Sequence, residues 1–160
     1  MAIGELQRAA LFEIVELWSP FVDESRSDLA AVLDDDDDQG PEGVLVDSLR
    51  GYCLTYCDWK SDPPEIRSYL ERLPLCPPEL TWEWYDWNDQ GRWDPDDLRK
   101  FLWPLADRCL TLGVAVVGVY VDGDGFTLGF IGVDKLDRLL KLAATAEAKI
   151  YVHRTGAPLP

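Results

Sequence analysis

The sequence predicts an α+β protein in which a single mixed sheet is covered by helices and preceded by an N-terminal helical arm. Two observations support this class. Apolar residues recur at helical spacing in several segments bounded by capping residues or prolines, and runs of β-branched and aromatic residues alternate with those segments. From residue 52 onward the expected order is β-α-β-α-β-β-α-β. We therefore expect a helical arm over residues 1–50, packed on or appended to an α+β domain over residues 51–160.

Helices account for the expected arm. The first covers about residues 4–18, where apolar positions follow a helical period until Pro20 ends it. A short second helix is expected over residues 28–33. A third is expected over residues 42–50, with Gly51 placed directly after its end, where a left-handed residue often terminates a helix.

The first half of the α+β domain shows two strand signals around one helix start. Residues 52–59 are rich in strand-forming side chains and predict the first core strand. Asp62 then precedes Pro63, which is the typical pairing of an N-cap residue and a first helical proline. Apolar and polar residues alternate over 80–85, and this period of two predicts a second strand.

The second half predicts a helix, a hairpin, another helix and a last strand. Asp94 is expected to cap the first of these helices, and Pro104 inside it should cause a kink. Asp134 is expected to cap the second helix. Glycine and aspartate between the hairpin strands tolerate the positive φ angles of a tight turn. The expected strands cover residues 114–121, 126–133 and 150–152.

Acidic side chains dominate the composition, with a formal net charge of −15 over 160 residues. Residues 1–98 hold 24 acidic and 7 basic side chains, a charge of −17, whereas residues 99–160 hold 6 acidic and 8 basic ones, a charge of +2. Because a polyanion is repelled by so acidic a surface, the composition excludes nucleic acid as a partner. The asymmetry between the halves indicates a surface for a basic protein, although solubility alone also explains exposed acids.

Two acidic segments are the candidates for that surface. Five consecutive aspartates repel one another in a helix, so Asp34–Asp38 should form a solvated loop. The loop from Asp86 to Asp97 combines carboxylates with exposed tryptophans, which suit a partner carrying arginine or lysine. Trp82 and Trp84 are expected to fill the core instead. The predicted partner-binding residues are Asp34, Asp35, Asp36, Asp37, Asp38, Asp86, Trp87, Asp89, Trp93 and Asp94.

No catalytic residue and no resident cofactor are assigned. His153 is the only imidazole, and the sequence shows no phosphate-binding glycine loop or nucleophile motif. Calcium is an alternative for the second acidic segment, because oxygen ligands at alternate positions around Gly91 resemble a calcium-binding loop. The candidate ligands are Asp86, Asn88, Gln90, Asp94 and Asp97. Helix capping explains the last two equally well.

The segment beginning at Met1 lacks the features of a signal peptide, and no apolar run is long enough to cross a bilayer. The four cysteines, Cys53, Cys57, Cys76 and Cys109, show no metal-binding spacing. Buried reduced thiols are the simplest interpretation, and a cytoplasmic location follows from it.

Short motifs link the chain to a known family. Asp58-Trp59-Lys60 ends the first strand, a tryptophan-containing segment follows, and a valine-rich hairpin ends near Asp122-Gly123-Asp124. With these motifs the chain resembles a bacterial domain-of-unknown-function family over about residues 50–150, without the helical arm. Gly125-Phe126 stands where a Ser-Tyr-like pair is expected. The resemblance implies no activity. In general character the chain is also similar to immunity proteins, small acidic inhibitors of basic toxins.

The sequence thus favours a binding protein over an enzyme. The first hypothesis is a stoichiometric inhibitor, an immunity protein for a basic bacterial toxin, whose acidic face imitates a polyanionic substrate. The alternative is a small enzyme or ligand-binding domain with a pocket at the strand ends, near Asp58, Lys60 and Asp122.

Overall fold

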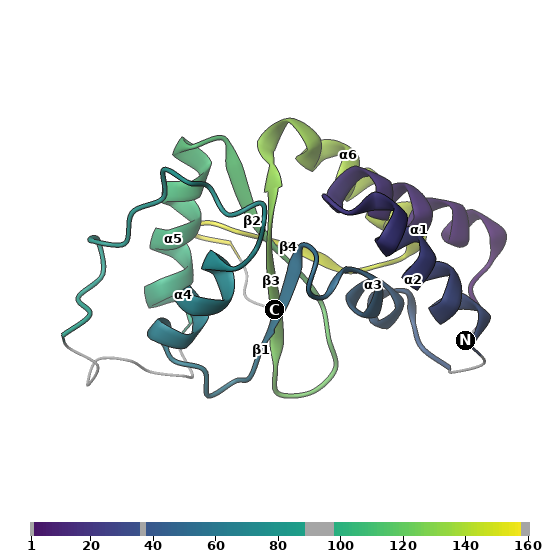
Figure 1. Ribbon diagram of the computed structural model, residues 1–160, viewed down its shortest axis with the longest axis horizontal. Helices are drawn as coiled ribbons and strands as arrows, with labels where there is room; N and C mark the ends of the chain where they lie inside the picture. The colour runs from purple at the N-terminus through teal and green to yellow at the C-terminus, as the bar shows by residue number, and fades with distance from the viewer. Residues whose placement is uncertain (1, 36–37, 89–97, 158–160) are drawn as a thin grey trace.

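The computed structural model describes residues 2–35, 38–88 and 98–157. Within these residues six helices and four strands form a single α+β arrangement (Figure 1). The helices are α1 (Glu5–Trp18), α2 (Val22–Asp34), α3 (Pro41–Leu49), α4 (Pro63–Glu71), α5 (Arg99–Thr111) and α6 (Val133–Ala146). The strands are β1 (Leu54–Cys57), β2 (Val114–Val119), β3 (Phe126–Gly132) and β4 (Ile150–His153).

The four strands form one sheet in the order β1-β3-β2-β4. The single sheet covered by helices is confirmed, but its three strand pairs are all antiparallel, so the sheet is not mixed. The predicted hairpin is β2 followed by β3, with Val117 opposite Gly129 as its last regular pair. Because the strands of a hairpin run in opposite directions, β2 ends and β3 begins at the turn of residues 120–125. The pairing of Cys57 with Phe126 brings the end of β1 to the same place.

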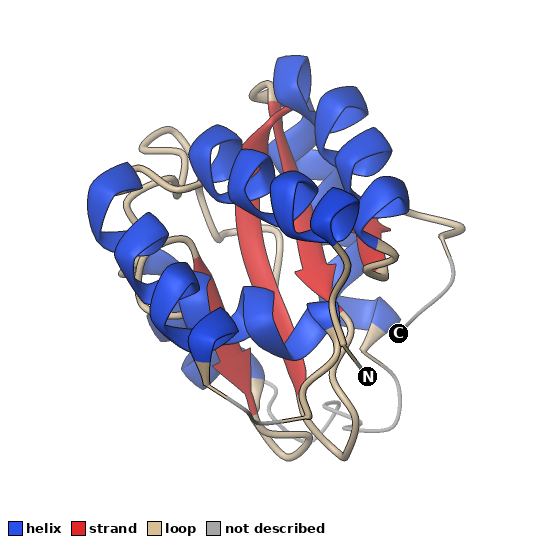
Figure 2. Cartoon of the chain, turned by 90° about the vertical axis from the view of Figure 1, so that its right-hand side faces the viewer, coloured by secondary structure: helices blue, strands red, loops and turns tan. Residues whose placement is uncertain are grey.

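Helices pack on both faces of the sheet, and each face has its own core. On one face α1, α3 and α6 cover inward side chains such as Val117 and Ile131. On the other face α4 and α5 cover Val116 and Phe130. Alternate residues of one strand point to opposite faces, so the valine-rich β2 serves both cores. Figure 1 shows the two helical layers on either side of the strands, and Figure 2 shows helices of the first layer lying across them.

Trp18 joins the arm to the sheet. Its side chain is only 2% exposed, and its indole nitrogen donates a hydrogen bond to the carbonyl oxygen of Phe130 at 2.8 Å. Gly129 makes room for this contact, because a Cβ there would lie 3.1 Å from the indole ring. The helices before residue 50 therefore share a core with the strands.

Most expected helix boundaries have a local explanation. Asp62 caps α4 by accepting the N–H of Glu65 at 3.0 Å, as predicted, and Pro63 begins the helix. Gly51 follows α3 with φ 87°, the left-handed conformation expected of it. Pro104 lies inside α5, also as predicted. The expected cap of α5, Asp94, falls outside the described residues, and α6 begins at Val133, so Asp134 lies in its first turn rather than at its cap.

Two expected elements are wrong in extent or type. The second helix is not confined to residues 28–33, because α2 begins at Val22, where Asp23 and Glu24 complement the positive end of the helix dipole. The expected strand over residues 80–85 does not form. Turn hydrogen bonds from Leu80 and Tyr85 occupy this segment, and no described strand pairs with it.

Candidate functional site

The first acidic segment lies at the end of α2 rather than wholly in a loop. Asp34 is the last helical residue, and its side chain remains 74% exposed although it pairs with Arg8 at 3.3 Å. Asp35 follows in extended conformation, and Asp38 is exposed. Asp36 and Asp37 lie outside the described residues. The carboxylates thus stand at the negative end of a helix dipole, where they add to the local negative potential.

The second acidic segment is described only at its start. Asp86 is exposed, and its carboxylate accepts the backbone N–H of Asn88 at 3.1 Å. Trp87 was expected to be exposed but is half-buried, because its indole nitrogen donates to the carbonyl oxygen of Trp82 at 2.7 Å and its ring packs on Phe101. The remaining predicted residues of this segment, Asp89, Gln90, Trp93, Asp94 and Asp97, lie outside the described residues.

An aromatic cluster explains the position of Trp87. We use this name for Trp82, Trp84, Tyr85, Trp87 and Phe101, whose rings contact one another with centroids 4.9–6.4 Å apart. Arg67 lies over the rings of Trp82 and Trp87, and Arg108 lies over Trp84. Trp82 is buried in the core as predicted, whereas Trp84 is half-buried. Since arginines of the chain itself occupy these rings, the cluster works as core packing.

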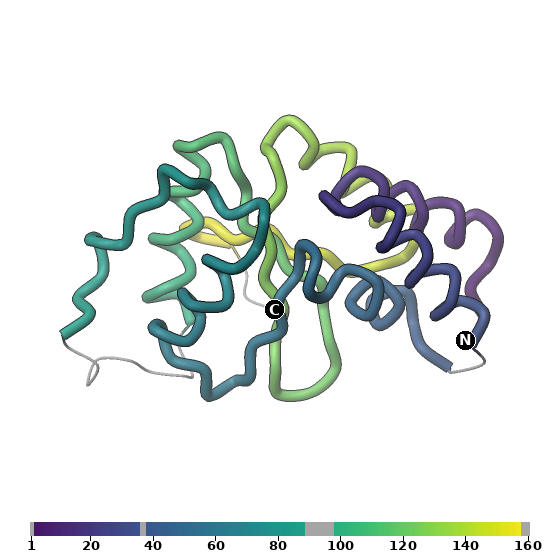
Figure 3. The backbone as a smooth tube through the Cα atoms, viewed as in Figure 1, coloured from purple at the N-terminus to yellow at the C-terminus, as the bar shows by residue number. Residues whose placement is uncertain are grey.

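The two acidic segments are not brought together. The chain around Asp35 and Asp38 is at one end of the long axis, and residues 80–88 are at the other (Figure 3). A single compact partner would have to span the molecule to contact both.

Calcium gains no support from the described residues. Only Asp86 and Asn88 of the candidate ligands can be placed. Within the described ranges no group of three or more histidine, cysteine or acidic side chains is arranged to hold a metal ion.

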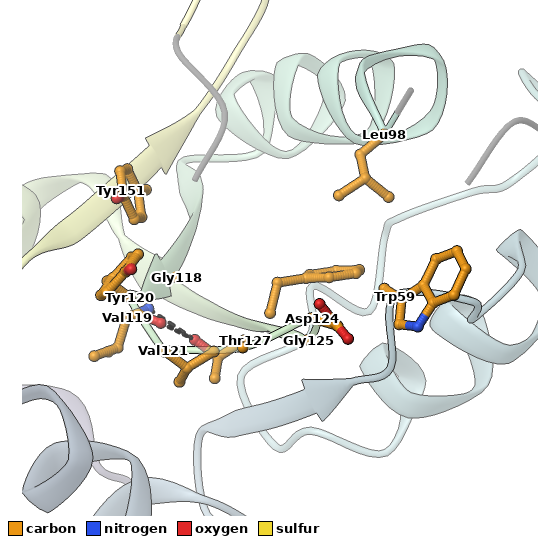
Figure 4. Close-up of a pocket in the computed structure, with 12 residues that line it drawn as sticks. Trp59, Leu98, Gly118, Val119, Tyr120, Val121, Asp124, Gly125, Thr127 and Tyr151 are labelled. Atoms are coloured by element: carbon orange, nitrogen blue, oxygen red, sulfur yellow. Dashed lines mark hydrogen bonds between the residues drawn. The ribbon is translucent and has the colours of Figure 1, made fainter. Parts of the chain in front are cut away.

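A pocket lies where the strands end, beside the β2–β3 hairpin (Figure 4). We call it the strand-end pocket; its volume is about 610 Å³. It exists because β2 and β3 separate beyond the pair of Val117 and Gly129. The Thr127 hydroxyl fills the gap by bonding both the N–H and the carbonyl oxygen of Val119 at 2.8 Å. The lining residues are Trp59, Leu98, Gly118, Val119, Tyr120, Val121, Gly123, Asp124, Gly125, Phe126, Thr127 and Tyr151.

Aromatic rings and one carboxylate give the pocket its chemistry. Tyr120 and Tyr151 lie on one side and Trp59 on the other, with the Asp124 carboxylate on the side of Trp59 (Figure 4). The Tyr120 hydroxyl donates to Asp122 at 3.0 Å. This hydrogen bond, followed by the negative charge of the same carboxylate, raises the pKa of Tyr120. The charge of Glu42 at the start of α3 raises it further.

Glycines allow the backbone to approach closely around this pocket. A Cβ on Gly118 would collide with the carbonyl oxygen of Thr127, and one on Gly125 would collide with the Tyr56 hydroxyl. A side chain at position 125 would therefore have to displace the Tyr56 ring. Gly118 inside a valine-rich strand was the one sequence signal for a close approach at this place.

His153 is the last residue of β4 and is buried beside Gly118. Its side chain is 1% exposed, and a Cβ on Gly118 would stand 3.6 Å from its Nε2 atom. Within the described part of the chain neither ring nitrogen has a hydrogen-bond partner. Burial lowers the pKa of His153 to about 4, so the ring is neutral at pH 7.

The cysteine thiols are free, as the sequence predicted. Cys53, Cys57 and Cys109 are buried, and Cys76 is half-buried. Burial raises the pKa of all four thiols, to about 11 for Cys76 and about 12 for Cys57 and Cys109. Because the thiolate is the reactive form, none of them is suited to nucleophilic chemistry.

Comparison with known proteins identifies a family but no activity. Over residues 10–153 the sequence matches the family described as "Domain of unknown function (DUF6630)". No curated protein and no solved structure matches the chain. Among the described residues no helix is long and apolar enough to span a membrane.

Proposed function

The chain belongs to this family of unknown function, and from its own residues we propose that it is a stoichiometric inhibitor of a basic protein, an immunity protein for a basic bacterial toxin such as a nuclease. A toxin that acts on a polyanion presents a basic surface, and an acidic protein of −15 net charge can cover that surface while steering rapid association.

The observation that carries the proposal is where the acidic charge lies. Asp34 and Asp35 stand at the C-terminal end of α2, and no basic residue occupies the last turn of that helix. Carboxylates at this end of a helix reduce its stability, because they face the negative end of the dipole. A solubility role would be served equally well by acids at helix N-termini, where they stabilise. Arg8 pairs with Asp34, and the placement of both acids against the helix dipole favours a partner that adds further positive charge.

The same acidic character continues toward the hairpin. Glu42 begins α3 shortly after Asp38, and its carboxylate accepts the N–H of Lys149 at 3.0 Å. Lys149 in turn accepts the N–H of Tyr120 at its carbonyl oxygen, 2.9 Å away. Because these contacts link α3 to the hairpin, we include Asp122 and Asp124 in the proposed acidic face together with the end of α2. Of the second predicted segment, Trp87 is left out of this face, because its ring packs in the aromatic cluster.

The test takes the product of the gene directly upstream, which should be a basic toxin. Co-expression with this chain should restore growth to cells that the toxin arrests. The purified proteins should form a one-to-one complex, and raising salt from about 0.05 M to about 0.5 M should weaken it at least about tenfold. An upstream product without basic charge, or a complex that is indifferent to salt, would contradict the proposal.

Two double variants locate the face. Asp35→Asn with Asp38→Asn should slow association about three- to tenfold, because steering depends on charge near the contact. Glu79→Gln with Glu83→Gln removes the same charge from exposed positions near the aromatic cluster and should leave the rate within about twofold. Equal effects of the two variants would assign the steering to net charge and refute this face.

The strand-end pocket supports a second candidate, a domain that binds a small ligand. Its position beside Trp59 and Asp124 is close to the strand ends at Asp58 and Asp122. Its volume of about 610 Å³ falls in the range of small-molecule sites. A stoichiometric small molecule retained in native mass spectrometry of the purified protein would favour this candidate over an inhibitor.

A further inference from the structure

We propose that the strand-end pocket receives an arginine side chain of the basic partner. This inference rests on the proposed function and names the contact that would anchor the complex. It follows from three properties of the pocket: its aromatic walls, the sign of its only lining charge and its continuity with the acidic face.

The walls suit a planar cation. The rings of Trp59, Tyr120 and Tyr151 line opposite sides of the space. A guanidinium group is planar, weakly hydrated and stacks on aromatic faces, whereas an ammonium group is a compact, strongly hydrated charge. Lysines of the chain lie near two of these rings, Lys60 at 5.0 Å from the centroid of Trp59 and Lys149 at 5.1 Å from that of Tyr120. Both rings also line the strand-end pocket.

The charge in the pocket selects a cation over an anion. Asp124 is the only charged side chain among the twelve described lining residues. The carboxylate of Asp122, two residues before Asp124, accepts a hydrogen bond from the Tyr120 hydroxyl. A carboxylate can accept two parallel hydrogen bonds from a guanidinium, so Asp124 supplies both charge and geometry.

The Asp124 carboxylate is the principal hydrogen-bond acceptor that the pocket offers to a cation. The Thr127 hydroxyl is committed to Val119, which it meets through both its donor and its acceptor. At Gly123 no described heavy atom lies within 4 Å of the position that a Cβ would take, so an elongated side chain can lie against the backbone there. We therefore expect an arginine to enter beside the hairpin, with its guanidinium between the rings and against Asp124.

The pocket can be tested without the partner. N-acetyl-arginine amide is titrated into ¹⁵N-labelled protein, and the shifts of the Trp59 indole and the Gly123 and Gly125 amides are followed. N-acetyl-citrulline amide, which has the same shape without the charge, is the matched probe. We expect arginine amide to bind at least about tenfold more tightly than citrulline amide.

Two variants complete the probe experiment. Asp124→Asn should weaken arginine amide binding about tenfold, because it removes the charge but keeps the side-chain shape. Asp137→Asn on α6 removes one charge from a side chain that is 82% exposed, and it should change binding less than about twofold. Equal binding of the two probes, or no difference between Asp124→Asn and the unaltered protein, would overturn the proposal.

The complex separates this inference from the proposed function. Asp124→Asn should weaken the toxin complex about tenfold, and Asp137→Asn should not. A salt-dependent complex that is insensitive to Asp124→Asn overturns the pocket as the anchor while the inhibitor function stands. If no basic partner exists but arginine amide binding still requires Asp124, the inhibitor function falls and the chemistry assigned to the pocket is upheld.

Discussion

The aromatic cluster and the strand-end pocket both contain tryptophan, but their rings face different surroundings. In the cluster, Trp84 and Trp87 satisfy their indole nitrogens with backbone carbonyls, and Arg67 and Arg108 cover ring faces. In the pocket, the rings of Trp59, Tyr120 and Tyr151 border an open space of about 610 Å³. The nearby His153 is buried, and its ring nitrogens have no hydrogen-bond partner among the described residues. The tryptophans that lie close together in the sequence therefore pack against one another, whereas the open pocket is built from segments far apart in the sequence.

Replacing one tryptophan in each region by alanine should give the largest difference in stability between the aromatic cluster and the strand-end pocket. Trp82 is 7% exposed and stacks on Phe101, so Trp82→Ala should lower the free energy of unfolding by about 3–5 kcal/mol. Trp59 is 39% exposed, and Trp59→Ala should lower it by less than about 1 kcal/mol. Urea unfolding followed by circular dichroism measures both. Similar losses would mean that the pocket wall is core.

His153 should make stability depend on pH. Its pKa is about 4 in the folded protein and near the ordinary 6.5 in the unfolded chain, so the unfolded state binds the proton more tightly. The stability is fully present above pH 6.5 and is lost as the pH falls toward 4. Between pH 7.5 and pH 5 this group should remove about 2 kcal/mol.

The variant His153→Leu isolates that contribution. It keeps a similar volume, removes two unpaired nitrogens and should flatten the pH dependence between pH 7.5 and pH 5 by about 2 kcal/mol. Urea unfolding of both proteins at the two pH values gives the difference. An unchanged slope would show that carboxylates, rather than the imidazole, set the response.

The Thr127 hydroxyl should stabilise the place where the regular pairing of β2 and β3 ends. Thr127→Val keeps the shape of the side chain but leaves the buried N–H and carbonyl of Val119 unpaired, which should cost about 1–2 kcal/mol of stability. Thr145→Val on the exposed face of α6 is the control and should change stability by less than about 0.5 kcal/mol. Thermal unfolding compares the two variants, and equal losses of stability would refute a special role for the Thr127 hydroxyl.

Substitutions of charged residues at helix ends should give the smallest changes in stability. Asp35→Asn should raise stability by about 0.3–1 kcal/mol, because it removes a carboxylate from the negative end of α2. On the side of the aromatic cluster, Asp62→Ala should lower stability by about 1 kcal/mol, because α4 loses its cap. Urea unfolding at low ionic strength measures both. A loss of stability in Asp35→Asn would show that the acidic run supports the fold.

Local signals predicted the elements that local forces determine. The cap at Asp62 and the left-handed Gly51 depend on near neighbours in the chain, and both are present. Pro104 lies inside α5, where the helical pattern placed it. The expected strand over residues 80–85 failed for a tertiary reason. Trp82 and Trp84 both pack on Phe101, although no described strand pairs with their segment. Their alternation in the sequence therefore resembles that of a strand.

The candidate site could be predicted only in outline. The sequence indicated strand ends near Asp58 and Asp122, and the pairing of Cys57 with Phe126 does bring those ends together. The pocket itself depends on where β2 and β3 part and on Tyr151 from a strand that follows another helix. Strand register and crossover are long-range properties, so the spacing of residues along the chain carried no signal for them.

The hydrogen bond from Trp18 to β3 has a consequence for which parts of the gene can evolve separately. Removing residues 1–50 would strip α1 and α3 from Val117 and Ile131, leave the Phe130 carbonyl without its donor and expose an apolar sheet face. An exposed face of that kind promotes aggregation. We therefore expect residues 1–50 and the strands to be duplicated, exchanged or fused as one unit during evolution, and a gene fragment that begins at β1 to encode a chain that does not fold alone.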